Sequence, residues 1–165
     1  MAADDVLRMR QIDFAAMSAL LGKYGLQLRL IEDGAAIPGS YWGEDEAGII
    51  GHEVFVRQDT PVHSVLHEAG HLIVLPPERR AEVHTDATDS IEEEDAVCVL
   101  QALLADALPG VGRNQVLADM DRWGYTFRLG SARAYVENDA ESAWQWLQTR
   151  GLIDARRQLL FAGVP

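Results

Sequence analysis

The amino-acid sequence predicts an α+β fold, because a helical pattern comes first, short strands follow, and helical patterns fill the rest of the chain. Apolar residues recur with helical spacing over residues 5–23, and this pattern stops at Gly25. Short apolar or alternating runs separated by glycines come next, which is typical of strands. From Thr60 onward the helical period continues almost to the end. This order does not alternate as a βαβ fold would.

The boundaries of the expected elements follow from punctuating residues. Thr60 suits a helix N-cap, Pro61 suits the first helical position, and Pro76-Pro77 ends that helix. Strands are expected at 26–30, 41–42, 49–50 and 54–56, a polar loop at 78–89, and further helices at about 90–108, 114–123, 131–136 and 140–150. We expect a single domain over 1–165, with an N-terminal helix and small mixed sheet within an α/β part (about 1–75) and a helical part (about 90–165).

Composition and charge exclude several classes of protein. The 165 residues carry a formal net charge of -12, which disfavours direct binding to nucleic acid or to anionic membrane surfaces. No apolar run approaches the ~20 residues needed to cross a bilayer, and the acidic N-terminus is unlike a secretory signal. These features predict a cytoplasmic protein. Cys98 is the only cysteine, so no intrachain disulfide is expected and its thiol is best interpreted as part of the core.

One motif carries recognisable chemistry. His67-Glu68-Ala69-Gly70-His71 places two imidazoles one turn apart on one face of a helix, where both can bind a single Zn²⁺. Glu68 then lies beside the open position of the metal and can act as a general base. The alternative is a pair of solvated surface histidines with a solvated acid. His63 extends the row one turn earlier, as a residue that supports a ligand or as a further candidate ligand.

The apolar face of this helix favours the metal-binding interpretation. Both motif histidines project to the side opposite the apolar arc, which an ordinary amphipathic helix fills with Lys, Glu or Gln. The arc is formed by Val62, Val65, Leu66, Ala69, Leu72 and Ile73.

A third ligand is expected from the following helix. Pro76-Pro77 occupies the place where a metzincin would continue to a third histidine, so that class is excluded. Of the acidic residues that begin the next helix, Glu93 projects into the predicted apolar face, where a carboxylate is costly unless it is paired or metal-bound. Glu92 and Glu94 remain alternatives, and Ser90 with Glu93 could instead form a capping box. His84, Asp86 and Asp89 are best interpreted as loop residues.

These residues resemble a known family. The strand Gly51-His52-Glu53-Val54-Phe55-Val56, the helix bearing His67-Glu68-Ala69-Gly70-His71, and the helix beginning Glu93-Glu94-Asp95-Ala96 are similar to the short gluzincin metallopeptidases of the ImmA/IrrE type. The resemblance covers about residues 26–108 and implies a zincin-like fold, with His67, His71 and Glu93 as zinc ligands and Glu68 as base. The chain differs at Val97, where relatives often carry Asn or Asp, and at Val99, where phenylalanine is usual.

The sequence therefore predicts a zinc metallopeptidase that binds one Zn²⁺ per chain and hydrolyses a peptide or protein substrate with metal-activated water. The alternatives are a zincin-like domain that binds metal or a protein partner without turnover, and a helical interaction module with an accidental motif. The oligomeric state is not predicted. Candidate oxyanion partners are Tyr125, Arg133 and Tyr135, each more simply interpreted as a packing or surface residue. Packing roles are expected for Trp123, Trp144 and Trp146.

Overall fold

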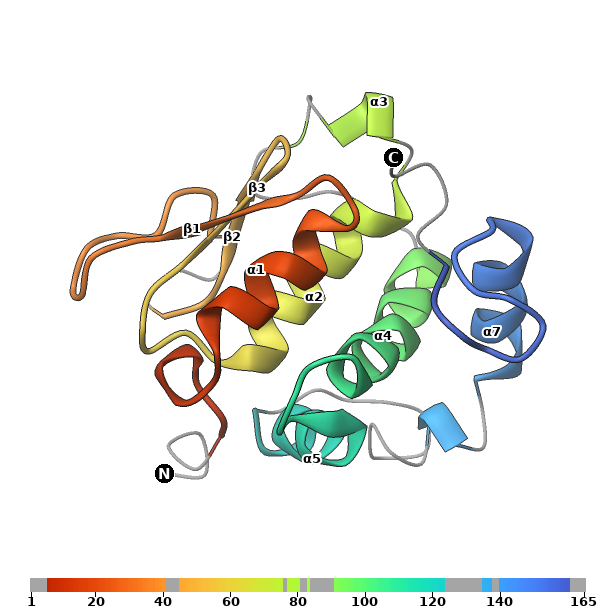
Figure 1. Cartoon of the computed structure of the whole chain (residues 1–165). Helices are drawn as coiled ribbons and strands as arrows, with labels where there is room; N and C mark the ends of the chain where they lie inside the picture. Colours follow the sequence, from red (N-terminus) through yellow and green to blue (C-terminus); the bar gives the residue numbers. More distant parts are fainter. Residues whose placement is uncertain are drawn as a thin grey trace.

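The computed structural model describes residues 6–40, 45–75, 77–80, 83, 91–123, 135–137 and 140–160. It is an α+β arrangement with a small sheet on one side of helix α2 (Val62–Val74) and helix α4 (Ile91–Asp106) on the other (Figure 1). Helix α2 contacts strands β2 (Gly48–Ile50) and β3 (Glu53–Val56), and it packs against α4. The helix that bears the histidine motif is therefore central to the fold.

The N-terminal helical pattern forms two shorter elements. The 3-10 turn η2 (Met9–Gln11) precedes helix α1 (Phe14–Gly22), whereas the sequence predicted one helix over residues 5–23. The backbone N–H of Met9 donates to the carbonyl of Thr60 at 2.8 Å, which ties this segment to the start of α2. The Asp13 side chain accepts the Ala15 N–H at 3.0 Å and caps α1. Tertiary pairing and this cap account for the break.

The sheet has three strands in the order β1-β3-β2. Strand β1 (Gln27–Leu30) is parallel to β3, with Leu28 opposite Val54, and β2 is antiparallel to β3, with Ile49 also opposite Val54. This confirms the small mixed sheet and the strands expected at 26–30, 49–50 and 54–56. The strand expected at 41–42 lies outside the described residues.

The helical part follows the sequence prediction closely. Helices α2, α4, α5 (Gly112–Trp123) and α7 (Glu141–Thr149) correspond to predicted helices, and most of the helix predicted at 131–136 lies outside the described residues. A short additional helix, α3 (Pro77–Arg80), occupies part of the predicted polar loop. Arg80 is buried, and it donates from Nε to the carbonyl of Leu72 and from Nη1 to that of Tyr24, both at 2.7 Å. The guanidinium thus satisfies a carbonyl of the last turn of α2.

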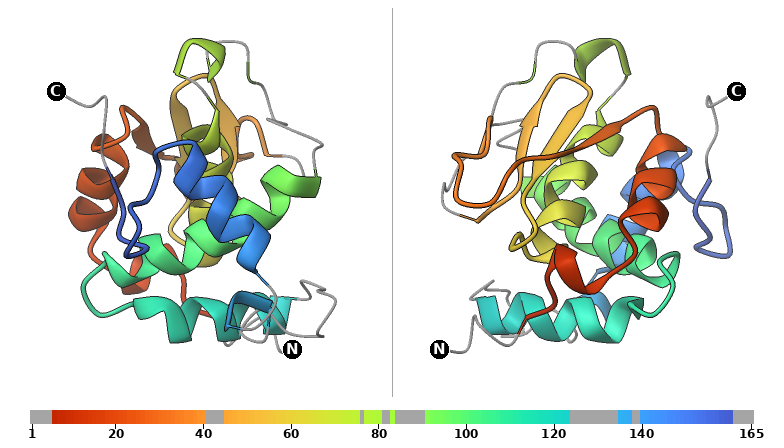
Figure 2. Two further views of the ribbon diagram at one scale, coloured as in Figure 1. Left: turned by 90° about the vertical axis from the view of Figure 1, so that its right-hand side faces the viewer. Right: turned by 60° about the vertical axis from the view of Figure 1, so that its left-hand side comes forward.

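Helix α4 is enclosed by other elements along most of its length. It packs against α2, α5 and α7, and Figures 1 and 2 show it between these helices. Every residue from 96 to 105 is buried. The helix therefore has no single apolar face opposed to a solvated one, in contrast to the amphipathic helix predicted from the sequence. None of the helices in the part of the chain that the structure describes is both long and apolar enough to span a membrane.

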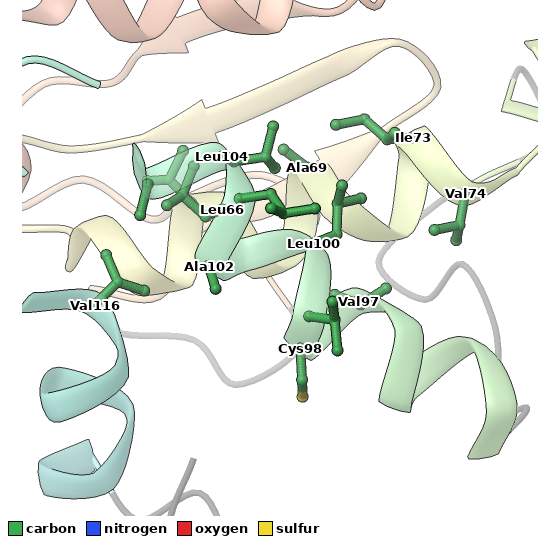
Figure 3. Packing of buried hydrophobic residues seen from close by; sticks show 14 of the residues in the cluster. Leu66, Ala69, Ile73, Val74, Val97, Cys98, Leu100, Ala102, Leu104 and Val116 are labelled. Atoms are coloured by element: carbon green, nitrogen blue, oxygen red, sulfur yellow. The ribbon is translucent and has the colours of Figure 1, made fainter. Parts of the chain in front are cut away.

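Helices α2 and α4 pack tightly against each other at Gly70. A Cβ added to Gly70 would lie 2.9 Å from Cγ1 of Val97, closer than carbon atoms normally pack. Figure 3 shows Val97 among the buried side chains between the two helices. The Gly in the histidine motif therefore allows the close packing that brings α4 to the histidines.

Gly70→Ala is expected to lower the free energy of unfolding by about 1–2 kcal/mol, because overpacking costs ~1–3 kcal/mol and the helical preference of Ala returns up to ~1 kcal/mol. The measurement is denaturant unfolding of the metal-free protein. Gly22→Ala is the matched control, since a Cβ there meets no atom within 4 Å, and it should be neutral or stabilising. The Gly70→Ala penalty should shrink in a Val97→Ala background. An equal penalty in both backgrounds would show that Val97 is not the obstruction.

Candidate metal centre

Helix α2 presents two imidazoles to one point. His67 and His71 are four residues apart, and their Nε2 atoms lie 3.2 Å from each other. The ring centroids are 4.7 Å apart and the rings are almost perpendicular, at 89°. Both side chains are largely buried. The pair therefore offers two nitrogen atoms with overlapping reach, as the motif predicted.

Helix α4 adds a carboxylate at the same point. Glu94 places Oε1 at 2.7 Å from His71 Nε2 and Oε2 at 3.7 Å from His67 Nε2. One ligand atom from each of these three residues lies within 4.8 Å of the other two, so together they could hold a metal ion. The Glu94 side chain is 45 % exposed, which leaves the group accessible from the carboxylate side.

The donor set and its spacing fit zinc. Bonds of ~2.0–2.1 Å to a tetrahedral zinc ion would put two imidazole nitrogens ~3.3 Å apart, and the two Nε2 atoms are 3.2 Å apart. Two imidazoles and one carboxylate also match the three-ligand pattern of catalytic zinc sites, which keep one position open. The same donors also bind other divalent ions.

The electrostatics keep the ligands in their binding forms. Burial and the neighbouring charge of His71 lower the pKa of His67 from 6.5 to about 4, against the opposing effects of its hydrogen bond to Gln101 and the charge of Glu94. Burial raises the pKa of Glu94, but its hydrogen bond to His71 and the charges of the two histidines outweigh this and leave the pKa below its usual value. At neutral pH the site therefore combines a neutral His67 imidazole with an anionic carboxylate.

The structure brings Glu94 to the histidines in place of Glu93, the third ligand predicted from the sequence. Glu93 is half-buried on the first turn of α4, but it does not belong to the group of ligand atoms found among the described residues. The prediction oriented α4 by its apolar residues, and this criterion fails because α4 is buried on several sides. The residues of α4 that face α2 are Glu94, Val97 and Gln101, which are three and four residues apart and therefore share one side of the helix. Glu93 is one residue away from Glu94 and points to a neighbouring side. Glu92 is exposed.

Gln101 belongs to the site, although it was not predicted from the sequence. Its Oε1 lies 2.9 Å from Nδ1 of His67, and its Nε2 donates to the carbonyl of His63 at 2.9 Å. The relevant signal was a single carboxamide inside the apolar run from Val97 to Ala105, because a buried polar group needs partners. Gln101 supplies a polar partner to His67, one of the candidate ligands, whereas Val97 lies against Gly70.

The other polar residues of the motif helix are not among the candidate ligands. Glu68 is half-buried on α2, next to His67, and is not among the candidate ligands. His63 is fully buried, and its ring packs edge-to-face on Trp123 with 5.2 Å between centroids. Trp123 Nε1 in turn donates to the carboxylate of Glu46 at 3.1 Å. His63 therefore packs on Trp123 near the N-terminal end of α2 and is not in the ligand group.

The remaining sequence candidates divide into two groups. Tyr135 and Trp144 are buried, and Arg157 stacks on Trp144 with 4.4 Å from its Cζ to the ring centroid, which supports packing roles. Arg150 stacks similarly on Trp146 at 3.6 Å. The candidates that lie outside the described residues are His84, Asp86, Asp89, Tyr125 and Arg133.

The buried His63 should make the protein acid-sensitive. Burial, together with the charges of His67 and Arg8, lowers its pKa from 6.5 to about 3. Because the folded-state pKa lies below the unfolded one, His63 stabilises the fold above about pH 6.5 and loses this contribution as the pH falls toward 3. From pH 7 to pH 5 the loss is about 2 kcal/mol.

His63→Phe should remove this part of the pH dependence while keeping a ring against Trp123. The measurement is urea unfolding at pH 7 and pH 5 with a chelator present. His52→Phe is the control, because His52 is exposed and should leave the pH dependence unchanged. If His63→Phe loses as much stability on acidification as the wild type, His63 is not the responsible group.

Comparison with protein-family models, curated proteins and solved structures gives no match for this chain. The fold and site nevertheless define a class: an α+β protein in which two helices bring two histidines and a glutamate together as a candidate metal centre.

Proposed function

We propose that this protein is a zinc-dependent hydrolase that cleaves peptide bonds with Glu68 as the general base. The observation that carries the proposal is the convergence of His67 and His71 Nε2 atoms, 3.2 Å apart, with the carboxylate of Glu94. Glu68, which lies between the two histidines in sequence, adds a proton acceptor beside this group. The resemblance to gluzincin metallopeptidases points to the same chemistry.

The residues of the site have three distinct roles in this proposal. His67, His71 and Glu94 would hold the zinc ion, and Gln101 hydrogen-bonds to His67 from behind. When bound, zinc supplies a Lewis acid that activates water and polarises the substrate carbonyl. Glu68 accepts the proton of the attacking water and then delivers it to the leaving amine, which is the role of a general base that later acts as an acid.

The presence of Glu68 favours turnover over a purely structural site. A structural zinc site needs four protein ligands and no base, whereas the group found among the described residues has three candidate ligands, and Glu68 follows His67 directly in the sequence. The partial exposure of Glu94 gives the open side access to solvent. A metal-binding domain that recognises a partner without turnover would have no use for the base.

The test is zinc content per chain by elemental analysis, combined with hydrolysis of a mixed peptide library followed by mass spectrometry. One zinc per chain and cleavage that a chelator stops and added zinc restores would support the proposal. Zinc without cleavage of any peptide would favour the non-catalytic metal-binding domain. A wild type that binds no zinc, even when zinc is supplied, would overturn the metal centre itself.

A further inference from the structure

A carboxamide couples the metal group to the first turn of α2. Gln101 is fully buried on α4, and its two ends reach two different atoms of α2. Its amide nitrogen donates to the carbonyl of His63, and its Oε1 lies 2.9 Å from His67 Nδ1. From these contacts we infer that Gln101 is a positioning residue that holds the His67 proton on Nδ1 and so presents the Nε2 lone pair to the metal. This inference rests on the proposed metal centre.

The direction of the carboxamide follows from its partners. A backbone carbonyl can only accept a hydrogen bond, so the NH₂ group of Gln101 must face His63. The carbonyl oxygen of Gln101 must then face His67, and it can only accept. A reversed carboxamide would set oxygen against oxygen at His63. The hydrogen-bond network thus assigns the orientation of the amide.

The tautomer of His67 follows from the orientation of Gln101. A neutral imidazole has one N–H and one bare nitrogen, and the hydrogen bond made by one nitrogen decides the state of the other. Nδ1 of His67 must donate to Gln101, so Nε2 carries the lone pair. This is the nitrogen 3.2 Å from Nε2 of His71 and 3.7 Å from the Glu94 carboxylate.

The burial of Gln101 fixes this arrangement. Gln101 is 0 % exposed, and a buried carboxamide is costly unless its donor and its acceptor are both paired. Both pairs are to residues one turn apart on α2, so turning the side chain would break two hydrogen bonds at once. His67 is therefore set for metal binding before the metal arrives, and zinc need not displace a proton from its Nε2.

The direct test is the tautomeric state of His67 in the metal-free protein at neutral pH, read from the ¹⁵N chemical shifts of its ring nitrogens. The wild type should show a protonated Nδ1 and a bare Nε2. Gln101→Met removes both hydrogen bonds at similar side-chain length and should shift His67 toward the Nε2–H form. Leu104→Met is the matched control on the same helix, equally buried, and should leave the His67 signals unchanged.

The second readout is zinc affinity by competition with a chelator. Gln101→Met should weaken zinc binding about 10- to 100-fold, as loss of a partner behind a ligating histidine typically does, while Leu104→Met should bind as the wild type does. A wild-type His67 protonated at Nε2 would overturn the inference even if Gln101→Met fails to fold. Unchanged tautomer and affinity in a folded Gln101→Met would also overturn it, with the metal centre intact. Failure of the metal centre would show separately, as loss of zinc binding by the wild type.

Discussion

Glu94→Ala is expected to abolish stoichiometric zinc binding, and Glu93→Ala is expected to leave it in place. Glu94 reaches both histidines, at 2.7 Å from His71 Nε2 and 3.7 Å from His67 Nε2, and it is the carboxylate of the candidate ligand group. With two imidazoles left, the site loses one of three protein ligands and its negative charge. The loss in affinity should exceed the about 100-fold that removal of a supporting residue can cost.

The two variants form a matched pair, because they remove the same side chain from adjacent positions on the first turn of α4. Elemental analysis after dialysis gives the stoichiometry, and chelator competition gives the affinity. Glu92→Ala serves as a further control, since Glu92 is exposed on the same turn. Loss of zinc in Glu93→Ala with retention in Glu94→Ala would return the third ligand to Glu93. Loss in both would indicate that the start of α4 depends on its acidic turn as a whole.

The motif on α2 could be predicted from sequence because its geometry is contained in one helix. Residues four apart meet on one face wherever the helix lies, so His67 and His71 needed no knowledge of the fold. The third ligand depends on how α4 faces α2. That orientation is set by the close contact of Gly70 with Val97 and by the burial of α4 between three helices. Neither is visible as a periodic pattern along α4.

Other differences arise from partners that are distant in sequence. The backbone N–H of Met9 donates a hydrogen bond to the carbonyl of Thr60, 51 residues later. This contact interrupts the N-terminal helical pattern. The role of Gln101 also depends on residues distant in sequence, because its partners His63 and His67 lie on another helix. Val97 stands where gluzincins of the ImmA/IrrE type often carry Asn or Asp, so the sequence lacks that polar side chain at this position. The structure supplies a polar partner from the next turn of the same helix.

Glu68→Gln is expected to lower peptide hydrolysis by about 100- to 10,000-fold, the usual contribution of a general acid–base group, while zinc binding stays at wild-type stoichiometry. The substitution keeps the size of the side chain and removes its ability to accept a proton. Glu68 is not among the candidate ligands, so metal binding should not depend on it. The measurement is the hydrolysis rate of a peptide cleaved by the wild type, with zinc content determined on the same preparation.

Comparison with His71→Ala separates catalysis from metal binding. His71 contributes Nε2 to the ligand group, so His71→Ala should lose zinc and hydrolysis together, whereas Glu68→Gln should lose hydrolysis alone. Unchanged hydrolysis in Glu68→Gln would assign the proton transfer to another group. Loss of zinc in Glu68→Gln would show that Glu68 supports the ligands and would remove the basis for its role as base. A zinc-binding domain without turnover predicts that Glu68→Gln has no effect, because only chemistry at the open metal position requires a base there.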